Sequence, residues 1–236
     1  GSLPIVADLI ALLPALGVIC CRGSGYDGVD IAAVRARGIG VTHGADLNAS
    51  SVADLAMGLL IASVRNMAVA REAIMQGAWR DDRIHSALRV RGLTGRRAGI
   101  YGLGAIGMRI AQRAAAFEME FGYHNRHARS DVTYRYFGSL ADLAHWAEVL
   151  IIAVRGGPAT HHAVGASILT ALGPTGFVVN IARGSVIDER ALIEALASGT
   201  IAGAGLDVFE HEPDGDQALL CLPHVALTPH MGGDTA

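Results

Sequence analysis

The sequence predicts an α/β protein built around a doubly wound parallel sheet. Along its 236 residues, short β-branched runs alternate with runs rich in alanine and leucine, which is typical of strand–helix–strand units. Residues 149–154 form an unbroken apolar run, as expected for a strand that helices cover on both faces. Because 51% of the chain is hydrophobic and only 17% is charged, the composition excludes a disordered protein.

The first part of the chain is expected to form short elements and then one long helix. We predict a helix at residues 4–16, a strand at 18–21, a short helix at 31–37 and a strand at 40–42. From residue 51, apolar side chains recur at helical spacing and predict a long helix that runs to Met75. The polar stretch 80–97 is interpreted as surface.

The rest of the chain carries the regular alternation. Strands are predicted at residues 98–101, 120–124, 132–136, 149–154, 177–181, 205–208 and 225–228. Helices are predicted between some of them, at residues 105–117, 140–146, 165–172 and 188–198. Six or seven strands in this order describe the doubly wound sheet.

Charge and residue usage exclude several classes of protein. The net charge of −3 argues against bulk electrostatic binding to nucleic acid or an anionic membrane. All 19 basic residues are arginine, which excludes Schiff-base lysines and the phosphate-binding lysine of P-loop enzymes. The three cysteines, two of them adjacent, argue against a disulfide framework and favour a reducing cytoplasmic compartment. The most apolar stretch, residues 9–21, is too short to span a bilayer and lacks the features of a signal peptide.

A glycine-rich motif at residues 102–107 is the strongest local signal. The sequence GLGAIG follows a predicted strand and opens a predicted helix, the context in which such a motif binds a dinucleotide. The glycines allow a tight turn and a close approach of the pyrophosphate, and the helix N-terminus attracts phosphate. A glycine-rich turn that binds nothing is the alternative. Cofactor contacts are predicted from Gly102, Leu103, Gly104, Ala105, Ile106 and Gly107.

The tip of the next strand bears on the choice of dinucleotide. NAD-specific folds place an acidic residue there to bind the ribose hydroxyls, but this chain has Asn125, followed by Arg126 and Arg129. Guanidinium groups in place of a carboxylate favour a 2′-phosphate. We therefore predict NADP as the cofactor, with NAD possible, and an arginine-rich surface turn as the alternative.

Three further residues follow predicted strands: Arg183, Glu212 and His230. The carboxyl ends of parallel strands line one crevice, so the three side chains are expected to face the cofactor together. A cation, a carboxylate and an imidazole that converge can bind an acid and move a proton. Each residue alone has an ordinary alternative, as a solvated arginine, a glutamate near a helix or a core histidine.

With these residues in view, the chain resembles the D-isomer-specific 2-hydroxyacid dehydrogenases, and most of all their glyoxylate/hydroxypyruvate reductase branch. The resemblance covers nearly all of residues 15–236 and includes the segments NIARG, DVFEHEP and TPHMGG and the upstream loop GSGYD. It implies a Rossmann domain at residues 51–231 and a flavodoxin-like substrate lobe, incomplete here, at residues 1–50. Residues 232–236 would begin the return to that lobe.

The resemblance also implies a role for each site residue. Arg183 would bind the substrate carboxylate, helped by the amides of Ser24 and Gly25. His230 would protonate the carbonyl oxygen, and Glu212 would hydrogen-bond His230 and favour its charged form. Asp207 would receive the nicotinamide carboxamide. Further cofactor contacts are expected from Ala153, Val154, Ile181, Ala182 and Gly232.

Some positions depart from the family pattern. His43-Gly44-Ala45 replaces the usual Asn-Thr-Pro near the substrate loop, and Arg155 stands where proline or a small residue is common. Glutamate rather than glutamine at position 212 argues against a formate dehydrogenase. No set of cysteine, histidine and acidic residues has metal-ligand spacing, so no metal is expected. The adjacent His161 and His162 are expected to point apart.

The predicted function is therefore the NADPH-dependent reduction of a small 2-keto acid, glyoxylate or hydroxypyruvate, to the D-2-hydroxy acid. One alternative is another D-2-hydroxyacid dehydrogenase, of the phenylpyruvate, lactate or phosphoglycerate type. A non-catalytic NAD(P)-sensing protein and a nucleotide-binding remnant are the others. The resemblance implies a homodimer formed by the cofactor domain, through the long helix and the arm after Trp79. The chain is shorter than family members, so we expect either a truncated gene product or a sequence from which disordered terminal segments are omitted.

Overall fold

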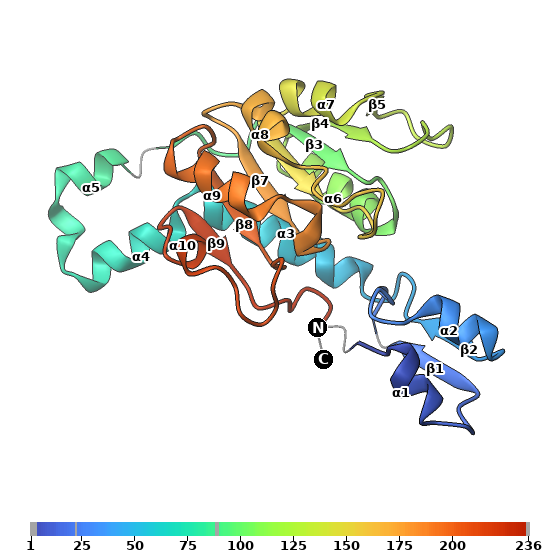
Figure 1. Cartoon of the computed structure of the whole chain (residues 1–236). Helices are drawn as coiled ribbons and strands as arrows, with labels where there is room; N and C mark the ends of the chain where they lie inside the picture. Colours follow the sequence, from blue (N-terminus) through green and yellow to red (C-terminus); the bar gives the residue numbers. More distant parts are fainter. Residues whose placement is uncertain (1–3, 22, 88–89, 235–236) are drawn as a thin grey trace.

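Two parallel sheets form the framework of the chain in the computed structural model, which describes residues 4–21, 23–87 and 90–234 (Figure 1). The smaller sheet pairs β1 (Val18–Cys21) with β2 (Gly40–His43). The larger sheet has the strand order β5-β4-β3-β6-β7-β8-β9, and every pair is parallel. Its strands are β3 (Arg97–Tyr101), β4 (Glu120–His124), β5 (Arg135–Tyr136), β6 (Val149–Ile152), β7 (Phe177–Asn180), β8 (Gly203–Leu206) and β9 (Val225–Leu227).

Some helices connect strands within a sheet, and α3 to α5 lie in the chain between the smaller and the larger sheet. The α-helices are α1 (Ala7–Ala11), α2 (Ile31–Ala36), α3 (Ala49–Val64), α4 (Met67–Met75), α5 (Asp82–Ala87), α6 (Ala105–Ala116), α7 (Leu140–Trp146), α8 (Ala166–Leu172), α9 (Glu189–Ala197) and α10 (Gln217–Leu220). Two short 3₁₀ helices are η1 (Ala78–Arg80) and η2 (Gly184–Val186).

Helices cover the larger sheet on both faces, which confirms the predicted fold class. One apolar core lies between the sheet and α7, α8 and α9, and a second lies between the sheet and α3 and α6. Every residue of β6, β7 and β8 is buried, which explains the unbroken apolar run that begins at residue 149. The fold is therefore the doubly wound Rossmann arrangement.

Several helices begin at a residue whose side chain caps them. Asp30 accepts a hydrogen bond from the Ala33 amide at the start of α2, and Asp188 does the same for the Ala191 amide at α9. Ser139 caps α7 in the same way. Such caps satisfy backbone donors that the first turn of a helix leaves unpaired. The sequence therefore fixes these helix starts locally.

The prediction of one long helix to Met75 is wrong. The helix divides into α3 and α4, which are bent by 59° relative to each other. The bend falls at Asn66, whose backbone adopts a left-handed conformation with φ of 48°, a conformation that ends an α-helix. Within the described residues no single helix is long and apolar enough to cross a membrane, although α3 and α4 together would meet that test.

Smaller differences concern element ends. The predicted helix at 4–16 shortens to α1, the strand at 132–136 shortens to β5, and the strand predicted at 205–208 begins earlier, at Gly203. The stretch 80–97, interpreted as irregular surface, contains α5 and the first residue of β3. Helix α10 was not predicted; Asp216 caps it by accepting the Ala218 amide.

The contact between α3 and β8 joins distant parts of the chain. Ser63 in α3 donates a hydrogen bond from Oγ to the carbonyl oxygen of Ala204 at 2.9 Å, across 141 residues of sequence. Gly205 lies against Leu59, and a side chain there would press on both Leu59 and Ser63. The absence of a side chain at Gly205 therefore allows α3 to pack directly on the sheet.

The smaller sheet has a core of its own. Ile10 and Val34 from its two helices pack with Ile19, Val29 and Ile39. Figure 1 shows this N-terminal unit beyond one end of α3, separate from the seven-stranded sheet. Residues of both units line a common cleft.

Candidate active site

The glycine-rich loop lies between β3 and α6, as predicted. Gly102 has φ of 102°, and a side chain there would collide with the backbone of Ala153 and Val154. A side chain at Gly107 would collide with the carbonyl of Gly102. No side chain caps α6 at Gly104, and the space beside Gly104 is open. The free amides of this helix start can therefore meet a phosphate.

The residues after β4 hold the glycine-rich loop in place. Asn125 accepts the Leu103 amide through Oδ1 at 2.7 Å, and Arg129 donates to the Leu103 carbonyl at 2.8 Å. Arg129 also pairs with Asp131, and their hydrogen bond raises the pKa of Arg129 and lowers that of Asp131. Arg126 is exposed and has no ion pair with any described residue. Of the two predicted phosphate ligands, Arg126 is therefore the one without a competing carboxylate.

A cleft of about 880 Å³ lies between the N-terminal unit and the carboxyl ends of the large sheet. It brings together most of the predicted site residues: Ser24, Gly25, Gly104, Ala105, Ile106, Ala153, Val154, Ile181, Ala182, Arg183, Asp207, His230 and Gly232. His43, Asn48 and Arg155, at or near the departures from the family pattern, line it too. The cleft lining does not include Gly102, Leu103, Gly107, Asn125, Arg126, Arg129 or Glu212.

Arg183 extends into this cleft from the loop after β7. The loop is held by the buried Asn180, whose side chain accepts the Ala182 amide and donates to the Arg183 carbonyl. The Arg183 Nε donates to Oδ2 of Asp27 at 2.6 Å, and one of its terminal nitrogens, Nη1, donates to the Ala182 carbonyl at 2.6 Å. The other terminal nitrogen, Nη2, lies against Gly25, where a side chain would collide with it. One edge of the guanidinium therefore remains directed at the Gly25 loop.

Asp27 is a functional candidate that the sequence did not single out. It belongs to the recognised GSGYD loop, but 156 residues separate it from Arg183. No local spacing could pair them. The ion pair joins the N-terminal unit to the large sheet across the cleft.

Glu212 and His230 form a hydrogen-bonded pair. The His230 Nδ1 lies 2.7 Å from Oε2 of Glu212, and Oε1 of Glu212 accepts the Phe209 amide at 3.2 Å. Burial opposes ionisation of Glu212, but the hydrogen bonds from His230 and Phe209 lower its pKa overall. The His230 backbone is held at φ of 53°, a left-handed conformation that is uncommon outside glycine and is found at functional sites.

Asp207 fastens the loop that carries His230. Its carboxylate is buried and accepts three hydrogen bonds at 2.7–2.9 Å, from the Thr228 hydroxyl and from the amides of Met231 and Gly232. The predicted partner of the carboxamide thus lies in the cleft with its oxygens already engaged by the chain. Asp207 therefore helps to position His230 by holding the residues on both sides of it.

The prediction that His161 and His162 point apart is wrong. Their rings stack, with centroids 3.9 Å apart and an angle of 29° between the planes. His162 has φ of 49°, and this left-handed turn brings the two adjacent side chains to the same side. Nothing in the local sequence signals such a turn at a histidine.

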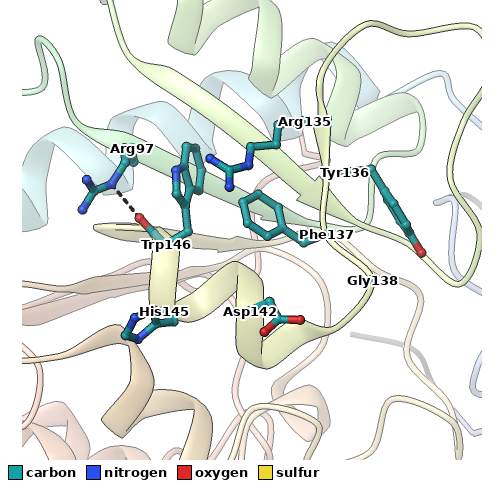
Figure 2. Close-up of a pocket in the computed structure, with 8 residues that line it drawn as sticks. All are labelled: Arg97, Arg135, Tyr136, Phe137, Gly138, Asp142, His145 and Trp146. Atoms are coloured by element: carbon teal, nitrogen blue, oxygen red, sulfur yellow. Dashed lines mark hydrogen bonds between the residues drawn. The ribbon is translucent and has the colours of Figure 1, made fainter.

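A second hollow lies along α7 and β5, beside the first residue of β3 (Figure 2). Arg135 lies over the rings of Phe137 and Trp146, at 4.7 and 5.6 Å from their centroids. Arg97 donates to the Trp146 carbonyl at 2.6 Å. Both arginines are thus already used to pack this edge of the sheet.

Comparison with known proteins adds independent information. The family model described as "D-isomer specific 2-hydroxyacid dehydrogenase, NAD binding domain" matches residues 57–232. The chain is 38% identical over 229 residues to a hydroxyphenylpyruvate reductase of Plectranthus scutellarioides, covering 97% of this chain and 72% of that protein. It is 40% identical over 235 residues to a 2-ketogluconate reductase of Gluconobacter oxydans, covering 100% of this chain and 75% of that protein.

Among solved structures, the fold is similar to a reductase from Sinorhizobium meliloti. That crystal structure is of an NADPH-dependent glyoxylate/hydroxypyruvate reductase in complex with NADP and malonate. The TM-score is 0.91 and the identity 40%, over 100% of this chain and 73% of the other. The likeness therefore extends over both the N-terminal unit and the large sheet.

Proposed function

Because the chain belongs to the D-isomer-specific 2-hydroxyacid dehydrogenases, we propose that it reduces a small 2-keto acid to the D-2-hydroxy acid with NADPH. Glyoxylate and hydroxypyruvate are the proposed substrates. The observation that carries the proposal is the placement of Arg183 and the Glu212–His230 pair beside one cleft that also reaches the glycine-rich loop. These are a carboxylate-binding group, a proton donor and a phosphate cradle in a single site.

The residues fit a dinucleotide. The open space beside Gly104 and the uncapped start of α6 suit its pyrophosphate, and Ala153, Val154 and Ile181 give the cleft an apolar wall for a nicotinamide ring. When bound, the reduced nicotinamide supplies the hydride that adds to C2 of the keto acid. Here residues 51–231 act as the dinucleotide-binding domain and residues 1–50 as the substrate lobe.

Arg183 and the Gly25 loop bind the substrate carboxylate. The guanidinium edge that faces Gly25 donates to the carboxylate oxygens, and the Ser24 and Gly25 amides complete the subsite. Asp27 holds the guanidinium through Nε, so that the remaining donors keep one direction. This contact aligns C2 of the substrate with the cofactor.

His230 then delivers a proton to the carbonyl oxygen. Nδ1 is engaged by Glu212, so the opposite ring nitrogen, Nε2, carries the proton towards the substrate. The Glu212 carboxylate stabilises the charged imidazole before transfer. Hydride and proton together convert the C=O group to CH–OH, and the keto acid is reduced as the cofactor is oxidised.

The reaction is tested by following NADPH oxidation with glyoxylate, hydroxypyruvate and phenylpyruvate in turn. Turnover with either of the first two and preference for NADPH over NADH is the expected result. Turnover with phenylpyruvate alone would replace the proposed substrate with the aromatic keto-acid class. Tight NADPH binding without turnover of any keto acid would contradict the enzymatic proposal and favour a cofactor-sensing protein.

Arg126 is proposed to bind the 2′-phosphate of NADPH. Arg126→Ala is expected to raise KM for NADPH by about 10-fold or more, because a charge-assisted hydrogen bond to the phosphate is lost. KM for NADH, which lacks that phosphate, is expected to stay nearly constant. Steady-state kinetics with both cofactors measure this, with the exposed Arg190→Ala in α9 as the control. Equal losses for both cofactors would contradict the assignment.

A homodimer through the cofactor domain is also proposed. Figure 1 shows α4 and α5 extending away from the large sheet, and α4 and η1 carry exposed apolar side chains, including Met75 (68%) and Trp79 (66%). Exposed apolar side chains grouped on one arm mark an interaction surface. Sedimentation is expected to give twice the chain mass of 24.5 kDa.

Trp79→Asp is expected to shift that dimer to the monomer, because a charge would be buried in the interface. Leu47→Ser is the matched control, since Leu47 is 90% exposed but lies outside the arm. A wild-type chain that sediments as a monomer would refute the dimer, and a dimeric Trp79→Asp variant would place the interface elsewhere.

A further inference from the structure

The loop between β6 and α8 presents two histidines beside a glutamate from a different part of the chain. The His162 amide donates to the Ser185 carbonyl at 2.8 Å, and its left-handed backbone directs both imidazoles to one side. Opposite them lies Glu210, whose amide donates to the buried Glu189 carboxylate at 2.9 Å. Backbone contacts therefore hold both halves of the cluster before any ligand binds.

The ligand atoms of this cluster are close together. One nitrogen from each of His161 and His162 and one carboxylate oxygen from Glu210 all lie within 4.8 Å of one another. Nε2 of His162 lies 2.8 Å from Oε1 of Glu210, at hydrogen-bond distance. None of the three residues lines the cleft that holds Arg183 and His230. The cluster therefore lies outside that cleft, although Glu210 is only two residues from Glu212 in sequence.

We propose that His161, His162 and Glu210 form a binding site for a first-row divalent transition-metal ion of the Zn²⁺ type. Two imidazoles and one carboxylate suit Zn²⁺, Ni²⁺ or Co²⁺, whereas Mg²⁺ and Ca²⁺ prefer oxygen ligands alone. Ligand atoms of a tetrahedral zinc ion lie roughly 3.3 Å apart, as zinc–nitrogen distances of about 2 Å require. The present separations are up to 4.8 Å, so coordination requires the three ligand groups to move closer together. His161 is exposed, which gives the ion a path from solvent, and water completes its coordination.

An ion at this site would restrain the segment from Phe209 to Glu212. Phe209, next to Glu210 in sequence, donates its amide to Glu212, the partner of His230. Metal binding would fix the Glu210 side chain and so restrain the start of this segment. Because the ion binds the folded chain and its ligands disperse on unfolding, it raises the melting temperature.

The test is a calorimetric titration of the chelator-treated full chain with ZnCl₂, without cofactor or keto acid. One Zn²⁺ per chain is the expected stoichiometry at the tight site, and a Co²⁺-loaded sample should show the visible absorption of low-coordinate cobalt. His161→Ala and Glu210→Gln are each expected to weaken Zn²⁺ binding by roughly 100-fold. Loss of a residue that only hydrogen-bonds a metal ligand already costs about 10- to 100-fold, and loss of a ligand should cost at least as much. The side chain of His161 is exposed, so His161→Ala keeps the fold and the metal-free turnover.

Two controls identify the site. His145→Ala removes another exposed histidine, on α7, and should leave Zn²⁺ binding unchanged. His230→Gln removes the imidazole of the other histidine–carboxylate pair and should leave it unchanged too. The proposal is overturned if the chain binds no Zn²⁺, if His161→Ala and Glu210→Gln bind it as the wild type does, or if His230→Gln abolishes binding. Because the readout is metal binding, failure here is distinct from failure of the reductase proposal.

Discussion

Replacing His230 with glutamine is expected to lower kcat for keto-acid reduction by about 100-fold or more, the usual contribution of a general acid. Glutamine keeps a polar side chain of similar reach but cannot deliver a proton. The dissociation constant for NADPH should hardly change, because the phosphate cradle at Gly102–Gly107 is untouched. Steady-state kinetics and fluorescence titration of NADPH measure the two quantities. A kcat close to that of the wild type would refute His230 as the proton donor.

Glu212→Gln provides the companion to that experiment. It keeps a hydrogen-bond acceptor for Nδ1 of His230 but removes the charge, so a smaller fall in kcat is expected than for His230→Gln.

The pKa of Glu212 is lower in the folded chain than its ordinary value, because the hydrogen bonds from His230 and Phe209 outweigh burial. The stabilisation from this pair is therefore present above the ordinary carboxyl pKa and is lost as the pH falls through the lowered value. Assays near neutral pH keep the Glu212 carboxylate charged.

Arg183→Lys is expected to lower kcat/KM for the keto acid by about 100-fold, while NADPH binding persists. Lysine keeps the positive charge but loses the planar fork that binds a carboxylate through two parallel hydrogen bonds. Loss of one of these two charge-assisted hydrogen bonds, at roughly 1.5–3 kcal/mol, accounts for a fall of this size. The exposed Arg190→Lys is the matched control. Unchanged kcat/KM would refute Arg183 as the carboxylate ligand.

Variants of Asp27 test whether the orientation of the Arg183 guanidinium matters, because they leave the guanidinium itself in place. Asp27→Ala removes the acceptor at Nε and should raise KM for the keto acid more than it lowers kcat, whereas Asp27→Asn keeps an acceptor and should restore part of the affinity. A structural collapse would lower kcat for both variants alike. The contrast between the two therefore reports on the alignment of Arg183.

Much of the large sheet could be predicted because its signals are local. Strand β6 is apolar at every position and β7 at all but its last, Asn180. The caps at Ser139 and Asp188 fix the starts of α7 and α9 through contacts only three residues apart in sequence. The glycine-rich loop follows from steric limits at Gly102 and Gly107 that apply to any chain in this turn. Element starts set by such short-range contacts can be identified without tertiary information.

The features that could not be predicted from the sequence depend on residues that are far apart in the chain. The sequence near Asn66 has no proline or glycine, the residues that most often mark a helix end, and an asparagine alone is only a weak signal for the left-handed turn that ends α3. The pairing of Asp27 with Arg183 and the approach of Glu210 to His162 span 156 and 48 residues. Both are consequences of the assembled fold. Periodicity and spacing describe one segment at a time and cannot reveal them.

The packing of α3 on β8 has a consequence for how the chain folds during synthesis. Ser63 leaves the ribosome 141 residues before Ala204, its hydrogen-bond partner. At typical translation rates of about 5–20 residues per second, the part of α3 that packs on β8 stays uncovered by that strand for roughly 7–30 seconds. A nascent chain with an exposed helix of this kind is a substrate for chaperones. Shielding of this part of α3 in the growing chain therefore limits aggregation before the fold is complete.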